Sequence, residues 1–286
     1  RVEQKKAQLA DKLIADQLEK LGYESRQIKD GQGQVRYNRP AGEELIRWRL
    51  WDRTGGGLMA ELGSHQLDAA SIFISAMHGG VKQHPISVMC ASNRPVFGLD
   101  READDHVCCI YEFPFPGYNP DPKSFDNRKR IGVQYASING NGYGGYGEIV
   151  YGTRGTLILE REQDVQLYRD ASASKVTTSA AGPTLDTQAS GAAQAAAAAS
   201  GPANVSRGYR EQIEHWAWCI RQNPNNSDPN IHPRCYPKVA MADAVIALTT
   251  NIAAERQQRI EFKESWFDPD NDDTPEGVAP DLSRYA

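Results

Sequence analysis

The sequence predicts an α+β fold, a large and predominantly antiparallel open sheet with helices packed on one face. Helical periodicity occupies the first 80 residues and returns after residue 207. Between residues 81 and 170, six short β-branched or aromatic segments follow one another with only turns between them. Parallel neighbours would need crossover helices, which are missing from this stretch, so we expect antiparallel pairing.

Three helices are expected before the strands. Residues 2–21 alternate leucines with charges, and Gly22 is a plausible helix stop. After a loop marked by Gly31 and Gly33, residues 41–51 are rich in Glu, Arg and Leu. Residues 58–80 then predict one long, mostly buried helix.

A stretch of low complexity separates the strands from the last helices. Residues 171–206 are mostly Ala, Ser, Thr and Gly with almost no large apolar residue, and we expect a mobile insertion because so little surface can be buried. Helices are predicted over residues 209–222 and 236–258, the second with an apolar stripe. Residues 271–286 are expected to form a polar, exposed tail.

Composition narrows the classes of partner. The 286 residues carry 32 Lys+Arg and 37 Asp+Glu, a net charge of −5, so no basic surplus is available for nucleic acid or an anionic membrane. No apolar run approaches the roughly 18–20 residues of a membrane span. Five cysteines spread over a long chain are no disulfide framework and favour a reducing compartment, the cytoplasm. Because the chain begins with Arg1, an upstream part is expected to be missing, and an export signal there stays open.

Three motif-like patterns are judged to be coincidental. Residues 140–145 satisfy G-x-G-x-x-G, but a strand-like sequence follows where a phosphate-binding helix is required, so no Rossmann domain is expected in this chain. The spacing of His215, Cys219, His232 and Cys235 could supply zinc ligands, although Cys219 lies in an apolar helix and His232 in a loop. Residues 268–273 imitate a calcium loop but lack its glycine and its final Glu. No metal is expected.

The best chemical candidate is the cluster of Glu61, His65 and Asp68. On a helix these positions are i, i+4 and i+7, so their side chains share one face. An imidazole beside carboxylates suits general acid–base work near neutral pH. The glycines at 55–57 would let a backbone or a ligand come close. Spacing alone favours a surface histidine flanked by ion-paired acids over a catalytic group.

The same segment, WRLWDRTGGGLMAELGSHQLDAA, resembles the opening of the C-terminal domain of the Gfo/Idh/MocA oxidoreductases, the glucose–fructose oxidoreductase and inositol dehydrogenase family. The strand block IYEF and GYGEIVYGTRGTLILER is similar to a hairpin of that family. The closing PKVAMADAVIALTTNIAAERQQRIEF with Ser265–Asp268 resembles its last helix and strand. The resemblance covers residues 36–170 and 207–270.

The resemblance implies part of an NAD- or NADP-dependent dehydrogenase that acts on a sugar, cyclitol or related polyol. His65 and Glu61 would be catalytic, with His65 as the acid–base residue facing the substrate hydroxyl or carbonyl. Asp68 and Arg49 would bind substrate, with Arg49 also able to contact the cofactor. Family members often form homo-oligomers through the sheet face, and we expect the same here.

The family's glycine fingerprint and its Glu-Lys-Pro lysine are missing from this sequence. We therefore expect the cofactor to be bound mainly by a missing nucleotide-binding domain, and this chain to be a fragment that is inactive alone. Its expected divisions are residues 1–35, a remnant of the inter-domain region; residues 36–270, the substrate domain with its insertion; and residues 271–286, the tail.

Two other functions stay open at this point. One is a free-standing carbohydrate-binding or oligomerisation module without a cofactor. The other is an interaction protein stabilised by zinc.

Overall fold

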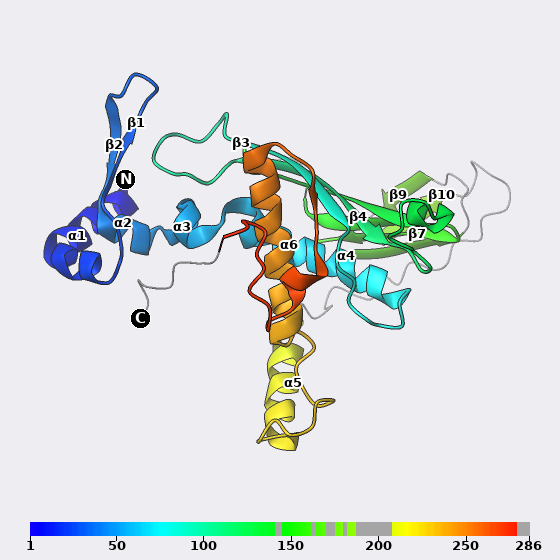
Figure 1. The fold of residues 1–286 in the computed structure, drawn as a ribbon. Helices are drawn as coiled ribbons and strands as arrows, with labels where there is room; N and C mark the ends of the chain where they lie inside the picture. Colours follow the sequence, from blue (N-terminus) through cyan, green and yellow to red (C-terminus); the bar gives the residue numbers. More distant parts are fainter. Residues whose placement is uncertain (141–144, 162–163, 170–174, 180–181, 187–207, 279–286) are drawn as a thin grey trace. The chain divides into compact units, whose positions relative to one another are not determined.

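The computed structural model describes residues 1–140, 145–161, 164–169, 175–179, 182–186 and 208–278. The chain divides into two compact units, one of residues 1–142 with 237–286 and one of residues 143–236. Helices and antiparallel sheets occur in both units, so the predicted α+β class is confirmed (Figure 1).

The first unit contains most of the helices. They are α1 (Val2–Lys20), α2 (Ala41–Ile46), α3 (Asp52–Gly55), α4 (Ser64–Ala76) and α6 (Pro237–Arg256), with 3-10 turns at Trp48–Leu50, Phe125–Arg128 and Glu264–Phe267. Its strands are β1 (Arg26–Lys29), β2 (Val35–Arg39), β3 (Ser87–Asn93), β4 (His106–Pro114), β5 (Arg130–Ile138) and β11 (Ile260–Glu261).

The main sheet of this unit has the strand order β11-β3-β4-β5, and every neighbouring pair is antiparallel. Side chains alternate across it as the pleat requires. On β4, Val107, Cys109, Tyr111 and Phe113 are buried, whereas Cys108 and Ile110 are exposed. Cys108 and Cys109 thus lie on opposite faces, as their adjacency in a strand predicts.

Helices α4 and α6 supply the apolar cover for the buried face. Ile246 on α6 and Leu67 on α4 are almost completely buried, and the Tyr111 hydroxyl of β4 lies 2.7 Å from the Thr250 hydroxyl of α6. The core cluster also includes Leu58, Met59, Ile74, Val88, Val107, Cys109, Phe113, Tyr135, Ala242, Ala247, Ala253, Trp266 and Phe267. The long helix expected over residues 58–80 is present but divided, because Met59–Gly63 forms a π-helical turn before α4 begins.

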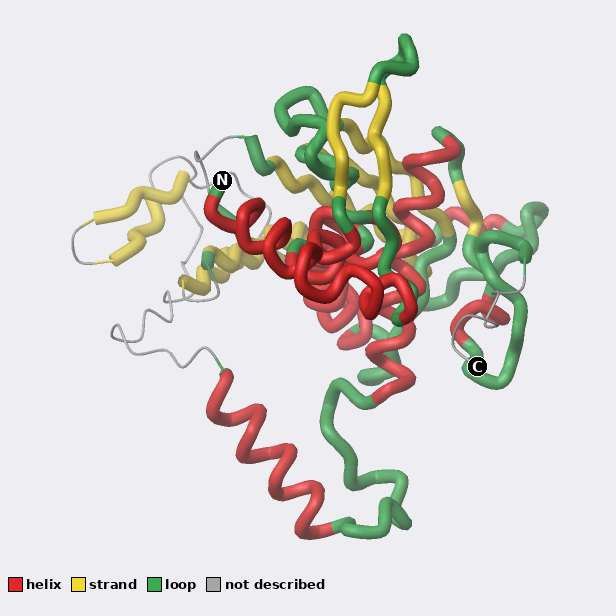
Figure 2. The backbone as a smooth tube through the Cα atoms, turned by 90° about the vertical axis from the view of Figure 1, so that its left-hand side faces the viewer, coloured by secondary structure: helices red, strands yellow, loops and turns green. Residues whose placement is uncertain are grey.

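The loop expected around Gly31 and Gly33 is the tip of a hairpin. β1 and β2 pair antiparallel, with Arg26 opposite Arg39, and Gly33 has a φ of 79° in the turn. Figure 2 shows this hairpin extending from the helical segment that contains α1 and α2. The strands are short and polar, which is why their sequence carries no clear period-two signal.

The second unit contains a three-stranded antiparallel sheet, a hairpin and a helix. The sheet joins β6 (Gly147–Gly152), β7 (Gly155–Glu160) and β8 (Asp164–Arg169) in that order, and β9 (Lys175–Ser179) pairs with β10 (Gly182–Asp186). This hairpin lies within the low-complexity stretch 171–206, whose other residues lie outside those described. Residues 141–144 of the G-x-G-x-x-G match also lie outside them, and the strand β6 follows where a dinucleotide fold needs a helix.

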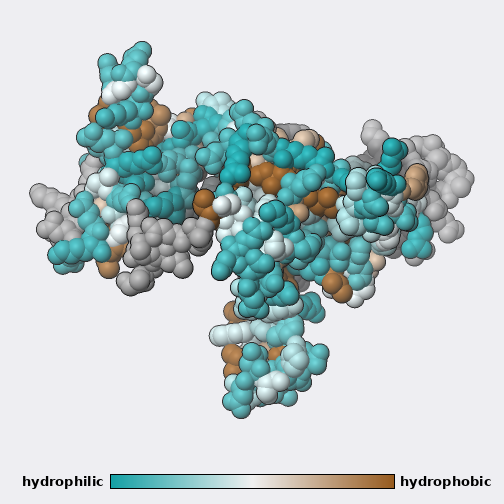
Figure 3. All heavy atoms as spheres, viewed as in Figure 1, coloured by the Kyte–Doolittle hydropathy of each residue, from teal (hydrophilic) through white to brown (hydrophobic). Residues whose placement is uncertain are grey.

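Helix α5 (Tyr209–Gln222) forms where the sequence predicts it and leaves apolar residues at the surface. Ile213 is 63% exposed and Ile220 is 49% exposed. Hydrophobic groups along α5 are visible in Figure 3. Within the described residues, no helix combines the length and the apolar character that crossing a bilayer requires.

Candidate functional site

A glycine turn opens the candidate site. Gly56 has a φ of 69° and Gly57 a φ of 65°, values in the left-handed region that glycine adopts without steric cost. The amide of Asn251 on α6 donates a hydrogen bond of 2.7 Å to the carbonyl oxygen of Gly56. The turn is also crowded, because a Cβ on Gly56 would lie 2.9 Å from the Cβ of Ala60. α6 therefore fixes the point from which the following helical turn starts.

The next turn presents Glu61. It belongs to the π-helical segment Met59–Gly63, a geometry that inserts an extra residue into a turn and recurs at functional sites. The wider turn alters the side-chain spacing expected of a regular α-helix. The Glu61 carboxylate pairs with the guanidinium of Arg49, with Nε and Oε1 2.6 Å apart, and that guanidinium also lies 4.9 Å from the Trp48 ring centre.

The solvent exposure of Arg49 and Glu61 determines how much their ion pair contributes to the stability of the fold. The side chain of Arg49 is 63% exposed and that of Glu61 32%. Exposed ion pairs contribute only about 0–1 kcal/mol to stability. The pair is therefore nearly dispensable for folding, and both groups can exchange their mutual contact for a polar ligand at small cost.

His65 lies on the exposed side of α4, one residue after the helix begins. Among the described residues, its ring makes no hydrogen bond or ion pair. The structure thus brings Arg49 and Glu61 into contact and leaves His65 open to a ligand. Because His65 follows Glu61 by four residues on a continuous helical segment, the two are held on one short stretch of backbone.

Asp68 is engaged differently from the other candidates. Its Oδ1 accepts a hydrogen bond of 2.8 Å from the Lys82 ammonium, which also donates to Oδ1 of Asp243 on α6 at 2.6 Å. The side chains of Lys82, Asp68 and Asp243 are 15%, 31% and 10% exposed. Burial raises the pKa of Asp243; Lys82 opposes this shift and nearby Asp68 adds to it. Asp68 thus ties α4 to α6 and lies in a position to orient the helix that carries His65.

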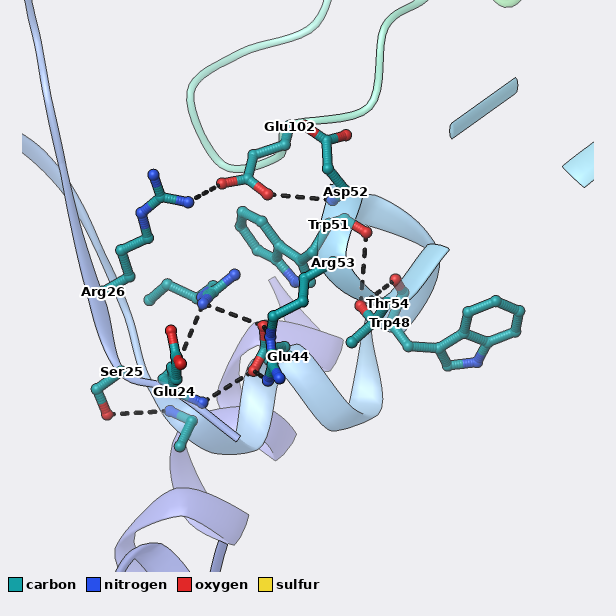
Figure 4. A network of polar contacts seen from close by, with 12 residues as sticks. Glu24, Ser25, Arg26, Glu44, Trp48, Trp51, Asp52, Arg53, Thr54 and Glu102 are labelled. Atoms are coloured by element: carbon teal, nitrogen blue, oxygen red, sulfur yellow. Dashed lines mark hydrogen bonds and ion pairs between the residues drawn. The ribbon is translucent and has the colours of Figure 1, made fainter. Parts of the chain in front are cut away.

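A polar network around the buried Glu44 holds the segment that carries Arg49 (Figure 4). The carboxylate of Glu44, which is completely buried, accepts hydrogen bonds from the Arg53 guanidinium at 2.9 Å and from the backbone amide of Glu24 at 2.8 Å. Burial raises the pKa of Glu44, but these hydrogen bonds outweigh it and keep that pKa below its ordinary value. The backbone amide of Asp52 donates to Glu102 at 3.1 Å.

Sequence reasoning missed Lys82, Asp243 and Asn251. Asp243 carried a usable signal, since it is an acid in the middle of the apolar stretch VAMADAVIAL of the last long helix. A buried acid in such a helix calls for a partner. Lys82 carried no such sequence signal, because it lies in a loop and is separated from Asp243 by 161 residues.

Two further features were considered as binding sites. An open cavity of about 420 Å³ is lined by Ser25, Arg26, Gln27, Asn38, Arg39 and Pro40. Its two arginines pair with Glu102 and Glu44, so it offers no free positive charge. Among the described residues, no group of three or more His, Cys, Asp or Glu side chains is arranged to hold a metal ion; Cys219 Sγ lies 3.8 Å from His215 Nε2.

No protein-family model and no curated protein matches this chain. Solved structures do resemble it. A putative oxidoreductase from Thermotoga maritima shares 17% identity over 89% of this chain and 59% of its own, with a TM-score of 0.46. An oxidoreductase from Sinorhizobium meliloti shares 18% identity over 72% of this chain and 53% of its own, with a TM-score of 0.45.

The apo form of a levoglucosan dehydrogenase shares 15% identity over 76% of this chain and 54% of its own, with a TM-score of 0.47. The chain therefore spans little more than half the length of these three solved structures.

Proposed function

We propose that this chain is the substrate-side domain of a nicotinamide-dependent oxidoreductase that acts on a sugar, cyclitol or related polyol. The observation that carries the proposal is the exposed His65 on the same helical segment as Glu61, which pairs with Arg49 at 2.6 Å. The hydroxyls of a polyol are held by polar donors and acceptors, and the hydroxyl that is oxidised needs a base.

In this proposal, Arg49 donates to a substrate oxygen and Glu61 accepts from a neighbouring hydroxyl. His65 accepts the proton of the hydroxyl that becomes a carbonyl, and returns it in the reverse direction. Asp68, through Lys82 and Asp243, keeps the first turns of α4 in place. The weakness of the exposed Arg49–Glu61 pair supports this assignment, since little folding energy is lost when a ligand separates the two.

The nicotinamide cofactor does not fit the residues described here. A dinucleotide fold needs parallel strands joined by helices. All strand pairs in the described part of the chain are antiparallel. The proposal therefore assigns NAD or NADP mainly to a nucleotide-binding domain outside residues 1–286.

The deciding experiment measures nicotinamide-dependent oxidation of a polyol panel by the protein that contains this chain, together with calorimetric binding of the same polyols. We expect His65→Asn to lower kcat by about 10²–10⁴-fold while polyol binding stays within about threefold. The matched control is Gln66→Ala on the next residue, with unchanged kcat. Full turnover in His65→Asn would refute the acid–base assignment. Polyol binding with no nicotinamide-dependent turnover would favour a carbohydrate-binding module instead.

A second part of the proposal concerns assembly. Met89, Ile110 and Ile138 lie on the outward face of three adjacent strands and are 49%, 52% and 51% exposed. Met89 stands directly opposite Ile110 in the register. We propose that a second copy of the chain covers this face, since exposed apolar side chains on neighbouring strands favour association.

Light scattering tests this assembly. Wild-type protein is expected to have at least twice the monomer mass, and Ile110→Asp the monomer mass. Ile72→Asp, at a 60% exposed position on α4, should leave the mass unchanged. A wild-type monomer refutes the assembly proposal. None of the five cysteines forms a disulfide in the structure, which suits the proposed cytoplasmic location.

A further inference from the structure

Cys90 and Cys109 face each other across neighbouring strands. Cys90 of β3 is the direct partner of Cys109 of β4 in the antiparallel register, and their sulfur atoms are 3.0 Å apart. Directly opposed residues have Cα atoms about 4.5–5.5 Å apart, which lies within the range of about 4.4–6.8 Å seen for disulfides. The backbone therefore needs no rearrangement for the two sulfurs to bond.

The two thiols differ in environment in the way that a reactive pair requires. Cys109 is 1% exposed, whereas Cys90 is only half-buried and is the more accessible of the two to a small reagent. The Cys109 thiol hydrogen-bonds to Cys90 and lowers the pKa of Cys90 despite its burial. The same contact, together with burial, raises the pKa of Cys109. Cys90 is thus the attacking sulfur and Cys109 the resolving one.

We propose that Cys90 and Cys109 are a reversible thiol–disulfide pair that is oxidised by a low-molecular-weight disulfide. The Cys90 thiolate attacks one sulfur of the small disulfide, breaks its S–S bond and releases one thiolate. Cys109 then loses its proton and attacks the Cys90 sulfur, which forms the internal disulfide and releases the second thiol. One small disulfide becomes two thiols while the two cysteine thiols become one disulfide, so atoms and electrons balance.

The pair lies beneath the π-helical segment of the candidate site. The Met59 sulfur is 3.9 Å from the Cys109 sulfur, and Met59 is itself 1% exposed. The Met59 side chain also fills the space beside Gly63, where an added Cβ would lie 2.8 Å from its Cε. A shift of the Cys109 sulfur toward Cys90 is therefore transmitted to the packing of the segment Met59–Gly63.

The test uses reduced, purified protein incubated with oxidised glutathione, quenched with acid, alkylated and digested with trypsin. Cys90 lies in the tryptic peptide of residues 83–101, because Pro95 protects Arg94 from cleavage, and Cys109 lies in that of residues 102–123. We expect these two peptides to become linked, and dithiothreitol to separate them again. This outcome does not depend on dehydrogenase activity.

Two variants assign the bond within those peptides. Cys108→Ser removes the exposed neighbour on the opposite face and should leave the linkage unchanged. Cys109→Ser should leave Cys90 with a persistent glutathione adduct. The proposal is overturned if the two peptides of wild-type protein stay unlinked, or if the linkage disappears in Cys108→Ser. It is also overturned if Cys109→Ser acquires no adduct at Cys90.

Discussion

Replacing Lys82 by methionine should destabilise the protein in a way that depends on pH. The substitution keeps most of the aliphatic stem and removes the ammonium group that bridges Asp68 and Asp243 at 2.8 Å and 2.6 Å. At an effective dielectric constant near 20, each contact represents about 6 kcal/mol of gross attraction. Desolvation of the three groups offsets most of that attraction, so the gross figure overstates what is lost.

The net loss of unfolding free energy depends on how deeply the partners of Lys82 are buried. Removing one partner of a fully buried pair costs about 3–5 kcal/mol. Asp68 is 31% exposed and recovers hydration, while Asp243, at 10%, can take up a proton instead of remaining charged. We therefore expect Lys82→Met to lower the free energy of unfolding by about 2 kcal/mol at pH 7.

The sign of the pH dependence is fixed by Asp243. Burial raises its pKa in the folded state, so its charged form costs stability above that pKa and the cost is relieved below it. Without Lys82 the pKa of Asp243 should rise further. The difference between variant and wild type should therefore shrink as the pH falls from 7 to 5.

Urea unfolding followed by tryptophan fluorescence measures this difference. The control is Lys129→Met, because Lys129 also forms a 2.8 Å pair, with Asp126, but both side chains are more than 40% exposed. That variant should lose less than about 1 kcal/mol. A Lys82→Met protein within 0.5 kcal/mol of wild type at pH 7, or one that loses more at pH 5, would falsify the reasoning. The double variant with Asp243→Asn should recover part of the loss.

Four further outcomes follow from the structure. Gly56→Ala should lower the free energy of unfolding in urea by about 2–3 kcal/mol, because it adds strain at positive φ to the contact with Ala60. A loss below about 1 kcal/mol would show that the turn relaxes. Ile246→Ala, at a fully buried position, should cost about 2–5 kcal/mol; a value near zero would contradict its place in the core. Asn251→Leu should cost about 1 kcal/mol by losing the hydrogen bond to Gly56, and unchanged stability would show that water replaces that bond. The pKa of Glu44 is held below its ordinary value of 4.5, so its contribution to stability is present above pH 4.5 and is lost as the pH falls through the folded pKa. Glu44→Gln should therefore flatten the fall in stability at acid pH. An unchanged fall in the variant would exclude Glu44 as its source.

Much of the fold could be predicted because its signals are local. The alternation of buried and exposed residues along β4 follows from the pleat, and the helices α5 and α6 begin within one residue of their expected starts. The hairpin β1–β2 and the strands β9 and β10 escaped prediction. Their sequences are polar or of low complexity, so no apolar period marks them.

The candidate site was predictable only in part. Spacing brought Glu61, His65 and Asp68 together as one helical face, but the π-helical turn and the pairing of Glu61 with Arg49 depend on how the glycine turn packs against α6. Which of the three side chains is open to a ligand and which is engaged in an ion pair also depends on packing. His65 is open, whereas Asp68 is held by Lys82.

By itself, the sequence determined the α+β class, the antiparallel pairing of the strands and the segment that carries the candidate chemistry. These depend on periodicity and turn residues, which act over a few positions along the chain. Only the tertiary structure decided that Lys82 joins Asp68 to Asp243, and that Cys90 faces Cys109 beneath Met59. Such contacts join residues up to 161 positions apart, and their geometry is set by how helices and strands pack, which no local pattern records.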